Sequence, residues 1–197
     1  MISLLGINLS VWLEIGFAAE LENMLLRPSS LFVWGGLSSI VAICVAVYTA
    51  FLFRQAKGRD LWQGKYLPLH MGVQAVIAGS AVWILLFDWV DGFGSMYRFC
   101  VTVLAVGIAI SAFIVFSEHI VGRSRIAAVR ISNRAMVFGE YKIWFWLGGM
   151  FAGHVLPLSV LFVETGGIGI MASVGALCGL FCYEYALVLA GQSVPNS

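Results

Sequence analysis

The sequence predicts an all-α fold, a polytopic bundle of about six transmembrane helices. Of the 197 residues, 61% are hydrophobic and only 11% are charged, whereas soluble domains carry about 25% charged residues. The apolar residues gather in segments long enough to cross a bilayer, and short polar connectors separate these segments. Because backbone groups in lipid must bond to one another, we expect helices within one integral membrane domain over residues 1–197.

The expected crossings follow one another along the chain. The first is expected at 3–24, where Glu14, Glu20 and Glu22 interrupt the apolar run. A Pro-Ser-Ser run at 28–30 favours the start of the second crossing, and Pro68 suits the first turn of the third. The second to sixth crossings are expected at 31–53, 67–89, 96–118, 143–164 and 168–190.

Local patterns predict further features of these elements. In the connector 119–142, Ile126, Ala127 and Val129 alternate with arginines, which predicts an amphipathic helix at the membrane interface. Pro157 predicts a kink near His154 in the fifth crossing. Small residues predict close helix contacts between the fifth and sixth crossings: Gly148, Gly149, Gly153, Gly175 and Gly179.

The basic residues predict the orientation of the bundle. With six crossings, the connectors 54–66 and 119–142 share one face with both termini, and that face holds nine of the eleven Lys and Arg residues. The opposite face holds Arg27 and Arg98 together with most of the interfacial acidic residues. The positive-inside rule therefore predicts that both termini lie in the cytoplasm, and the aromatic run 144–146 would belong to the interfacial belt on that side.

The composition argues against several kinds of site. The four cysteines lie in apolar segments and form no CxxC pair, so the sequence gives no support for iron–sulfur or zinc ligation. We expect no metal site in this chain. A net charge of +1 gives no basis for binding nucleic acid.

Ionisable residues at membrane depth are energetically unfavourable, and each is therefore a hypothesis about function. Histidines and carboxylates can titrate near neutral pH, so we expect a proton path from the cytoplasmic face into the bundle. Its candidate members are His70, Glu118, His119, Glu140, His154 and Glu184.

Structural roles are open alternatives for these same residues. His70, Glu118, His119 and Glu140 could lie at the wet interface, and His154 could donate a hydrogen bond to a carbonyl. Glu184 could pair with an arginine of the basic connectors. Two histidines at one depth can also ligate a b-type haem, which leaves His70 and His119 as a candidate pair.

Several stretches, taken in order, resemble one known family. MLLRPSSLFVWGGL, YTAFLFRQAKGRDLWQGKYLPLH, FGEYKIWFWLGGMFAGHVLPLSVLF and YALVLAGQ are similar to segments of the polysulfide reductase membrane subunits (NrfD/PsrC-like). The resemblance covers about residues 20–192 and matches the third to eighth helices of that family. Two N-terminal helices of the family have no counterpart, and Glu184 stands where a basic residue is common.

The resemblance implies a membrane anchor that exchanges electrons between a quinone (menaquinone or ubiquinone) and an iron–sulfur subunit on the non-cytoplasmic face. Molybdopterin or cytochrome subunits are expected beyond that partner, in a prokaryotic cytoplasmic membrane. The resemblance also implies no haem or metal in this chain, which would be a subunit of an oxidoreductase complex rather than an enzyme alone.

The same resemblance divides the chain into two parts. Residues 1–66 would complete a quinone-site bundle, with Glu14, Arg27 and Trp34 at the quinone, and residues 67–197 would form a second bundle that guides protons. Three rival functions stay open: a proton- or ion-coupled transporter, a haem b anchor, and a structural scaffold without a quinone site.

Overall fold

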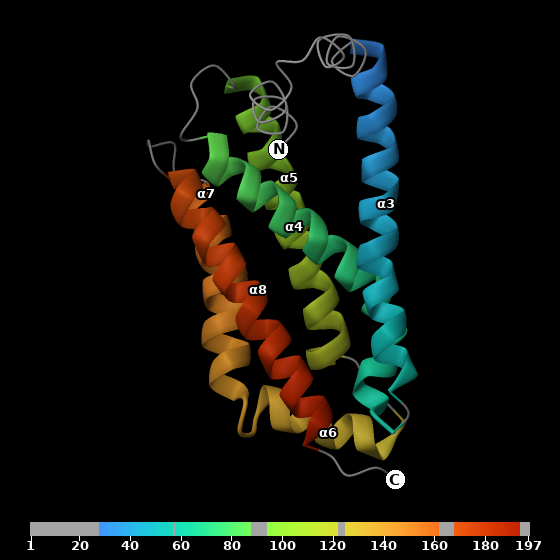
Figure 1. The fold of residues 1–197 in the computed structure, drawn as a ribbon. Helices are drawn as coiled ribbons and strands as arrows, with labels where there is room; N and C mark the ends of the chain where they lie inside the picture. Colours follow the sequence, from blue (N-terminus) through green and yellow to red (C-terminus); the bar gives the residue numbers. More distant parts are fainter. Residues whose placement is uncertain (1–27, 57, 88–93, 122–124, 162–167, 194–197) are drawn as a thin grey trace, which may run out of the picture. The chain divides into compact units, whose positions relative to one another are not determined.

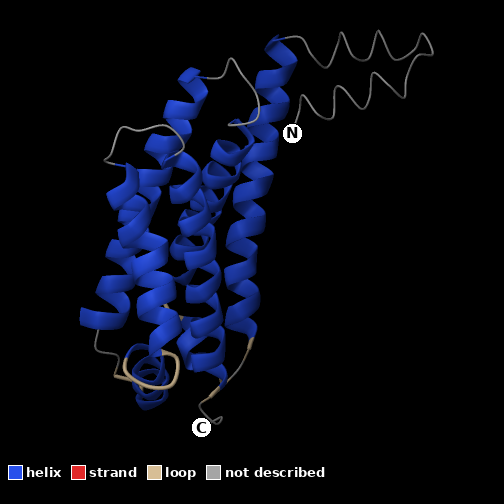
Figure 2. Cartoon of the chain, turned by 90° about the vertical axis from the view of Figure 1, so that its left-hand side faces the viewer, coloured by secondary structure: helices blue, strands red, loops and turns tan. Residues whose placement is uncertain are grey.

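The computed structural model describes residues 28–56, 58–87, 94–121, 125–161 and 168–193, and these residues form helices and turns without a strand (Figure 2). The predicted all-α fold is therefore confirmed. The predicted first crossing at 3–24 lies outside the described residues. The chain divides into two compact units, residues 1–45 and 46–197, and each is considered by itself.

Five helices in the described part of the chain are long and apolar enough to span a membrane. The protein is thus a multi-pass membrane protein. These five spans are Leu37–Gln55, Leu67–Leu86, Met96–Val121, Trp144–Leu161 and Gly169–Gln192. Each overlaps one of the crossings expected from the sequence.

Figure 1 shows the helices in chain order. The first is α3 (Pro28–Gln55), whose residues up to Val45 belong to the first unit. In that unit the large apolar side chains of Val33, Leu37 and Ile40 are exposed, as expected for a helix in lipid. The second unit contains η1 (Asp60–Gln63), α4 (Leu67–Phe87), α5 (Gly94–Val115), η2 (Phe116–Val121), α6 (Ala127–Val137), η3 (Trp144–Val155), α7 (Leu156–Leu161) and α8 (Ile168–Gln192).

Two of these elements are π-helices, and both adjoin α-helices. η2 extends α5, and η3 extends into α7, so that each pair makes one membrane crossing. At the second junction the Leu156 N–H donates to the Phe151 carbonyl, five residues back. The change from π to α geometry falls directly before Pro157, where the sequence predicted a kink.

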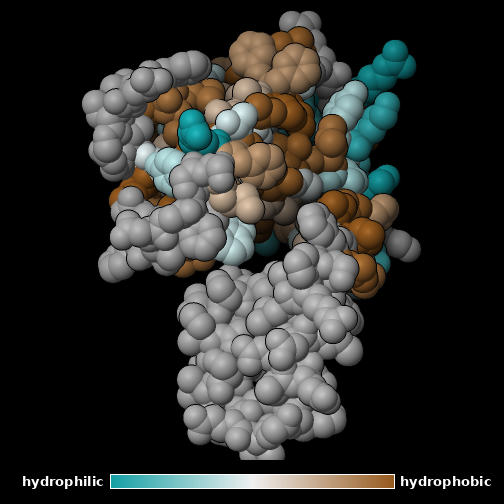
Figure 3. All heavy atoms as spheres, turned by 90° about the horizontal axis from the view of Figure 1, so that it is seen from above, coloured by the Kyte–Doolittle hydropathy of each residue, from teal (hydrophilic) through white to brown (hydrophobic). Residues whose placement is uncertain are grey.

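The second unit packs around two groups of buried side chains. One group surrounds Tyr183 and Phe145 near α6, and the other is an aliphatic group around Leu104 and Ile108. Large apolar side chains such as Phe99, Phe113 and Phe181 remain exposed and suit a lipid-facing surface. Brown apolar atoms make up most of the described surface visible in Figure 3.

Helices η3 and α8 cross where both carry glycines. A Cβ atom at Gly179 would collide with the Gly153 backbone, and one at Gly153 would lie 2.8 Å from the Gly179 Cα. A Cβ at Gly148 would meet the Cys182 side chain. The predicted close contacts between the fifth and sixth crossings are therefore confirmed.

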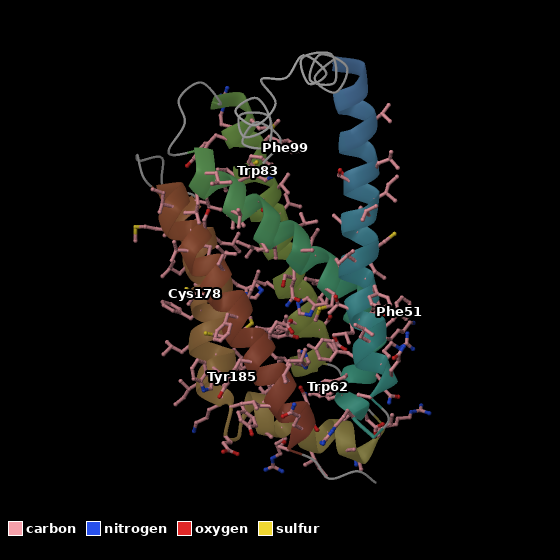
Figure 4. The ribbon with its side chains drawn as sticks, viewed as in Figure 1. Phe51, Trp62, Trp83, Phe99, Cys178 and Tyr185 are labelled. Atoms are coloured by element: carbon pink, nitrogen blue, oxygen red, sulfur yellow. The ribbon has the colours of Figure 1, made fainter. Side chains whose placement is uncertain are left out.

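The connector between α3 and α4 holds the end of α8 in place. Gly58 adopts a positive φ of 86°, which glycine tolerates readily. Arg59 then donates to the Gln192 carbonyl at 2.7 Å, and the Trp62 indole donates to the Leu187 carbonyl at 3.3 Å. Trp62 lies beside the C-terminal end of α8 in Figure 4. The bond from Arg59 satisfies a carbonyl that the last turn of a helix leaves free.

The predicted connector helix exists as α6, which runs across the lower end of the bundle in Figure 1. Its Ile131 side chain is exposed, whereas Met136 and Val137 are buried against the bundle. The aromatic run before the fifth crossing separates into two environments. Trp144 and Trp146 are exposed as an interfacial belt would require, but Phe145 is fully buried in the core.

Candidate functional site

Three histidines from three separate membrane crossings lie buried close together. His70 on α4 is 1% exposed, His119 on η2 is 6% exposed, and His154 on η3 is 5% exposed. They are all the histidines that the chain contains. His70 and His119 are therefore both buried side chains.

The Tyr183 hydroxyl on α8 connects two of these rings. Its oxygen lies 2.8 Å from Nε2 of His119 and 3.4 Å from Nδ1 of His70. The ring of Tyr183 also packs edge-on against the His70 ring, with centroids 4.9 Å apart. A side chain that is only 2% exposed thus joins η2 to α4 through a polar contact.

The Ser111 hydroxyl on α5 connects the other pair of rings. Its oxygen lies 3.3 Å from Nε2 of His70 and 3.1 Å from Nε2 of His154. Ser111 is 1% exposed. A continuous set of polar contacts therefore runs from His119 through Tyr183, His70 and Ser111 to His154, and we call it the histidine network.

Each end of the histidine network is held by a fixed acceptor. The Asn133 amide on α6 donates to the His119 backbone carbonyl at 2.7 Å, and its Oδ1 lies 2.9 Å from Nδ1 of His119. At the other end, Nδ1 of His154 donates to the Gly149 carbonyl at 2.8 Å. All six ring nitrogens of the three histidines therefore lie within hydrogen-bond distance of a polar atom.

Local helix geometry explains how these side chains reach one another. His119 and His154 both lie in π-helical segments, and such wide turns recur at functional sites. A π-turn also displaces the side chains that follow it from the positions of a regular α-helix. Gly149 permits the close approach of α8, since a Cβ there would lie 3.2 Å from the Tyr183 Cβ.

A cavity of about 480 Å³ adjoins the His119 end of the network. It lies between η1, η2 and α6, and its lining includes Glu118 and His119. The Glu118 carboxylate lies against Gly64, where an added Cβ would be 2.7 Å from Oε1. This volume is large enough to hold water molecules. The cavity can therefore bring water to the end of the network.

Glu184 and Gln74 form a second polar pair, between α8 and α4. The Gln74 amide lies close enough to the Glu184 carboxyl to act on it as a hydrogen-bond donor. However, Gln74 Nε2 and Glu184 Oε1 are buried and make no hydrogen bond of normal geometry within the described part of the chain. The two side chains are therefore close neighbours that leave polar atoms unsatisfied. The alternative role of Glu184, an ion pair with an arginine, is not formed among the described residues.

The structure brings together His70, His119 and His154, with Glu118 beside them and Glu184 next to Tyr183 in the chain. Glu140 is exposed in the turn before η3 and stands apart from the network. Of the predicted quinone residues, Glu14 and Arg27 lie outside the described residues. Trp34 lies in α3, and its side chain is not among those that the structure describes.

Sequence reasoning missed Tyr183, Ser111, Asn133 and Gln74. A single hydroxyl in an apolar helix gives little signal, because serine and tyrosine are common in such helices. Gln74 did carry a signal, since an amide one helical turn after His70 is a polar residue in an otherwise apolar span.

The haem alternative would require the histidine network to rearrange. Ligation by His70 and His119 through Nε2 would require this atom to be free on each ring, but these atoms already bond to Ser111 and Tyr183. In the described part of the chain, no group of three or more His, Cys, Asp or Glu side chains could hold a metal ion.

Comparison with known proteins agrees with the resemblance in the sequence. The model of the family described as "Polysulphide reductase, NrfD" matches residues 7–196. The chain belongs to this family. It is also similar to the C subunit of selenate reductase from Mesobacillus selenatarsenatis, with 22% identity over 176 residues, which are 86% of this chain and 38% of that protein. The chain thus spans well under half of that relative, and no solved structure matches.

Proposed function

We propose that this chain is a membrane subunit of a reductase complex and exchanges electrons between a quinone and a peripheral iron–sulfur subunit. Membership of the NrfD family and similarity to a subunit of a selenate reductase support this role. The complex would lie in a prokaryotic cytoplasmic membrane, with the iron–sulfur subunit on the outer face and molybdopterin or cytochrome subunits beyond it. Both termini of the chain would be cytoplasmic.

We further propose that this chain transfers protons, and the histidine network is the observation that supports this role. Reduction of a quinone to a quinol consumes two electrons and two protons, and lipid supplies no protons. Imidazole and hydroxyl groups can each accept one proton and release another, so four consecutive contacts permit transfer over the network. The cavity beside Glu118 and His119 offers contact with water at one end.

Proton transfer is tested by comparing two tyrosines on the same helix. Tyr183→Phe removes the hydroxyl between His119 and His70 and keeps the ring, whereas Tyr185→Phe removes a hydroxyl from a residue that is 40% exposed. We expect quinone-linked turnover to fall about a hundredfold in the first variant, the lower end for loss of acid–base transfer. Turnover in the second variant should be unchanged.

The measurement uses the complex reconstituted in vesicles, with proton uptake recorded beside quinone turnover. Equal turnover in the two variants would remove the network from the proton path. Proton movement that continues without any quinone would favour the rival function, a proton-coupled transporter.

The quinone site is proposed near Glu14, Arg27 and Trp34, with menaquinone or ubiquinone as the substrate. Its test compares Trp34→Leu with Trp83→Leu, a change at a partly exposed tryptophan on α4. We expect the apparent KM for quinone to rise about tenfold in the first variant only, since stacking on an aromatic ring contributes about 0.5–1.5 kcal/mol. An unchanged KM would exclude Trp34 from the pocket.

A further inference from the structure

We infer that the histidine network is a binding site for one excess proton and no more, with His70 as the ring that carries it. This proton site takes its biological meaning from the proposed role in proton transfer and rests on that role. The count of hydrogens itself follows from the hydrogen-bond partners alone.

The two ends of the network fix the tautomers of the outer rings. A carbonyl oxygen only accepts, so His154 must carry a hydrogen on Nδ1 to bond to Gly149. Asn133 donates through Nδ2 to the His119 carbonyl, which turns its Oδ1 toward the ring. His119 must then also carry its hydrogen on Nδ1. Each outer ring, when neutral, therefore presents a bare Nε2 to the interior of the network.

The interior has four contacts and, in the neutral state, three hydrogens to fill them. The contacts are His119 to Tyr183, Tyr183 to His70, His70 to Ser111, and Ser111 to His154. Tyr183, Ser111 and neutral His70 supply one hydrogen each. One contact must therefore join two acceptors without a hydrogen between them.

The distances indicate where the missing hydrogen belongs. The two contacts of His70, 3.4 Å to Tyr183 Oη and 3.3 Å to Ser111 Oγ, are the longest of the four, so the vacancy lies at this ring. With the vacancy at the longer of the two, Tyr183 donates to His119, His70 donates through Nε2 to Ser111, and Ser111 donates to His154. Every other contact is then a normal hydrogen bond.

A single added proton completes the network. Placed on Nδ1 of His70, it lets the imidazolium donate to Tyr183 and to Ser111, and charge-assisted bonds of this kind are roughly twice as strong as neutral ones. A second proton finds no vacant contact. It would have to displace a hydrogen bond at His119 or His154 and would place two positive charges in one buried network.

The charged surroundings favour one positive charge over two. His119 and His154 act electrostatically on His70, so a positive charge on one of these rings opposes a second charge on another, and Glu184 and Glu118 act on Tyr183. These groups come from η2, η3 and α8, the elements that surround His70 together with Ser111 on α5. Two carboxyl groups thus act on Tyr183, which contacts the proposed proton site, and Lys65 and Arg130 line the cavity at the His119 end of the network.

The test uses ¹⁵N-histidine NMR on the full 197-residue chain in lipid, without a histidine tag. Because the chain has three histidines and all belong to the network, every ring signal reports on it. At high pH we expect two rings protonated on Nδ1 and one on Nε2. On acidification, down to the lowest pH at which the chain stays folded, one imidazolium per chain and no second one should form.

Two variants distinguish one shared proton site from three histidines that take up protons independently. Tyr183→Phe leaves two contacts, from His70 to Ser111 and from Ser111 to His154, with two hydrogens to fill them, so no vacancy remains. We expect the imidazolium to disappear in this variant and to persist in Tyr185→Phe. Two or three imidazolium signals in the native chain, none at all, or persistence in Tyr183→Phe would each overturn the inference.

The number of imidazolium rings seen by NMR is independent of quinone turnover. A one-proton network in a protein whose Tyr183→Phe variant retains full quinone turnover would refute the proposed function and leave the proton count intact. Loss of turnover in Tyr183→Phe together with two imidazolium rings in the native chain would support the proposed function and refute the proton count.

Discussion

The same crossings of the bundle build two layers of opposite character. The polar layer contains His70, Ser111, His119, His154 and Tyr183, all buried. The aliphatic layer contains Ile77, Ala81, Ile84, Cys100, Leu104, Ile108, Ala172 and Ala176. Helices α4, α5 and α8 contribute to both layers, so the difference arises from a few side chains and not from the fold.

The two layers use polar side chains in different ways. Ser111 in the polar layer bonds to histidines on two other elements. Ser80, beside the aliphatic layer, returns its hydroxyl to the Val76 and Ile77 carbonyls of its own helix. The Ser111 hydroxyl thus joins helices, whereas the Ser80 hydroxyl bonds within its own helix.

This difference suggests how protons are confined. The histidine network ends at the Gly149 carbonyl, and among the described residues the other layer consists of aliphatic side chains and one thiol, that of Cys100, which is a weak donor. A proton cannot pass such a layer without water or titratable groups. We therefore expect the aliphatic layer to act as a seal, whereas the polar layer exchanges protons at its His119 end.

The largest expected effect comes from the close contact between η3 and α8 at Gly153 and Gly179. Gly179→Ala would place a methyl group into the Gly153 backbone, where no flexible side chain can move away. We expect loss of the folded chain, measured as loss of the monodisperse peak in fluorescence-detected size-exclusion chromatography.

Gly79→Ala is the matched control, since a Cβ there meets nothing within 4 Å. It should be neutral or stabilise the helix by about 0.5–1 kcal/mol, because alanine is a better helix former. Equal expression of both variants would show that η3 and α8 do not cross at these glycines.

The second effect compares a serine of each layer. Ser111→Ala leaves His70 Nε2 and His154 Nε2 buried without a partner, and each orphaned group is unfavourable by about 1–3 kcal/mol. Ser80→Ala removes a bond to carbonyls of the same helix and should change stability by less than about 1 kcal/mol. Thermal unfolding midpoints in detergent measure both. Similar shifts would contradict the distinction between the layers.

The smallest effect distinguishes the aliphatic layer from the surface that faces lipid. Ile108 is fully buried, whereas Ile110 on the same helix is 45% exposed. Ile108→Val should lower the free energy of unfolding by about 0.5–1.5 kcal/mol, and Ile110→Val by less than about 0.5 kcal/mol. Denaturant titration in mixed micelles provides the comparison. A larger loss of stability at Ile110 would show that the face of α5 that packs in the bundle carries Ile110 and not Ile108.

Much of the fold was predictable because its signals are local. The length and apolarity of each segment define the crossings, as in α4 and α8, and the alternating arginines at 125–134 predict α6. The glycines Gly153 and Gly179 indicated a close crossing, since only small residues permit one. Phe145 was assigned wrongly to an interfacial belt, because its type suits both the core and the interface.

The candidate site was predictable only in part. A histidine in an apolar segment is conspicuous, so His70, His119 and His154 were found, but so was Glu140, which is exposed and apart. Tyr183 and Ser111 carry no comparable signal. Their role depends on which residues of other helices lie opposite them, and that depends on π-helical turns that the sequence does not indicate.

By itself, then, the sequence determined a multi-pass helical membrane protein of a known family with three histidines in or beside its apolar segments, because hydropathy, length and motif order are properties of the chain alone. The tertiary structure decided that the histidines meet through Tyr183 and Ser111 and that an aliphatic layer accompanies them. The physical reason is that hydrogen bonds between helices require distances of about 3 Å, which only the crossing of η3 with α8 and the packing of α4 against α5 can set.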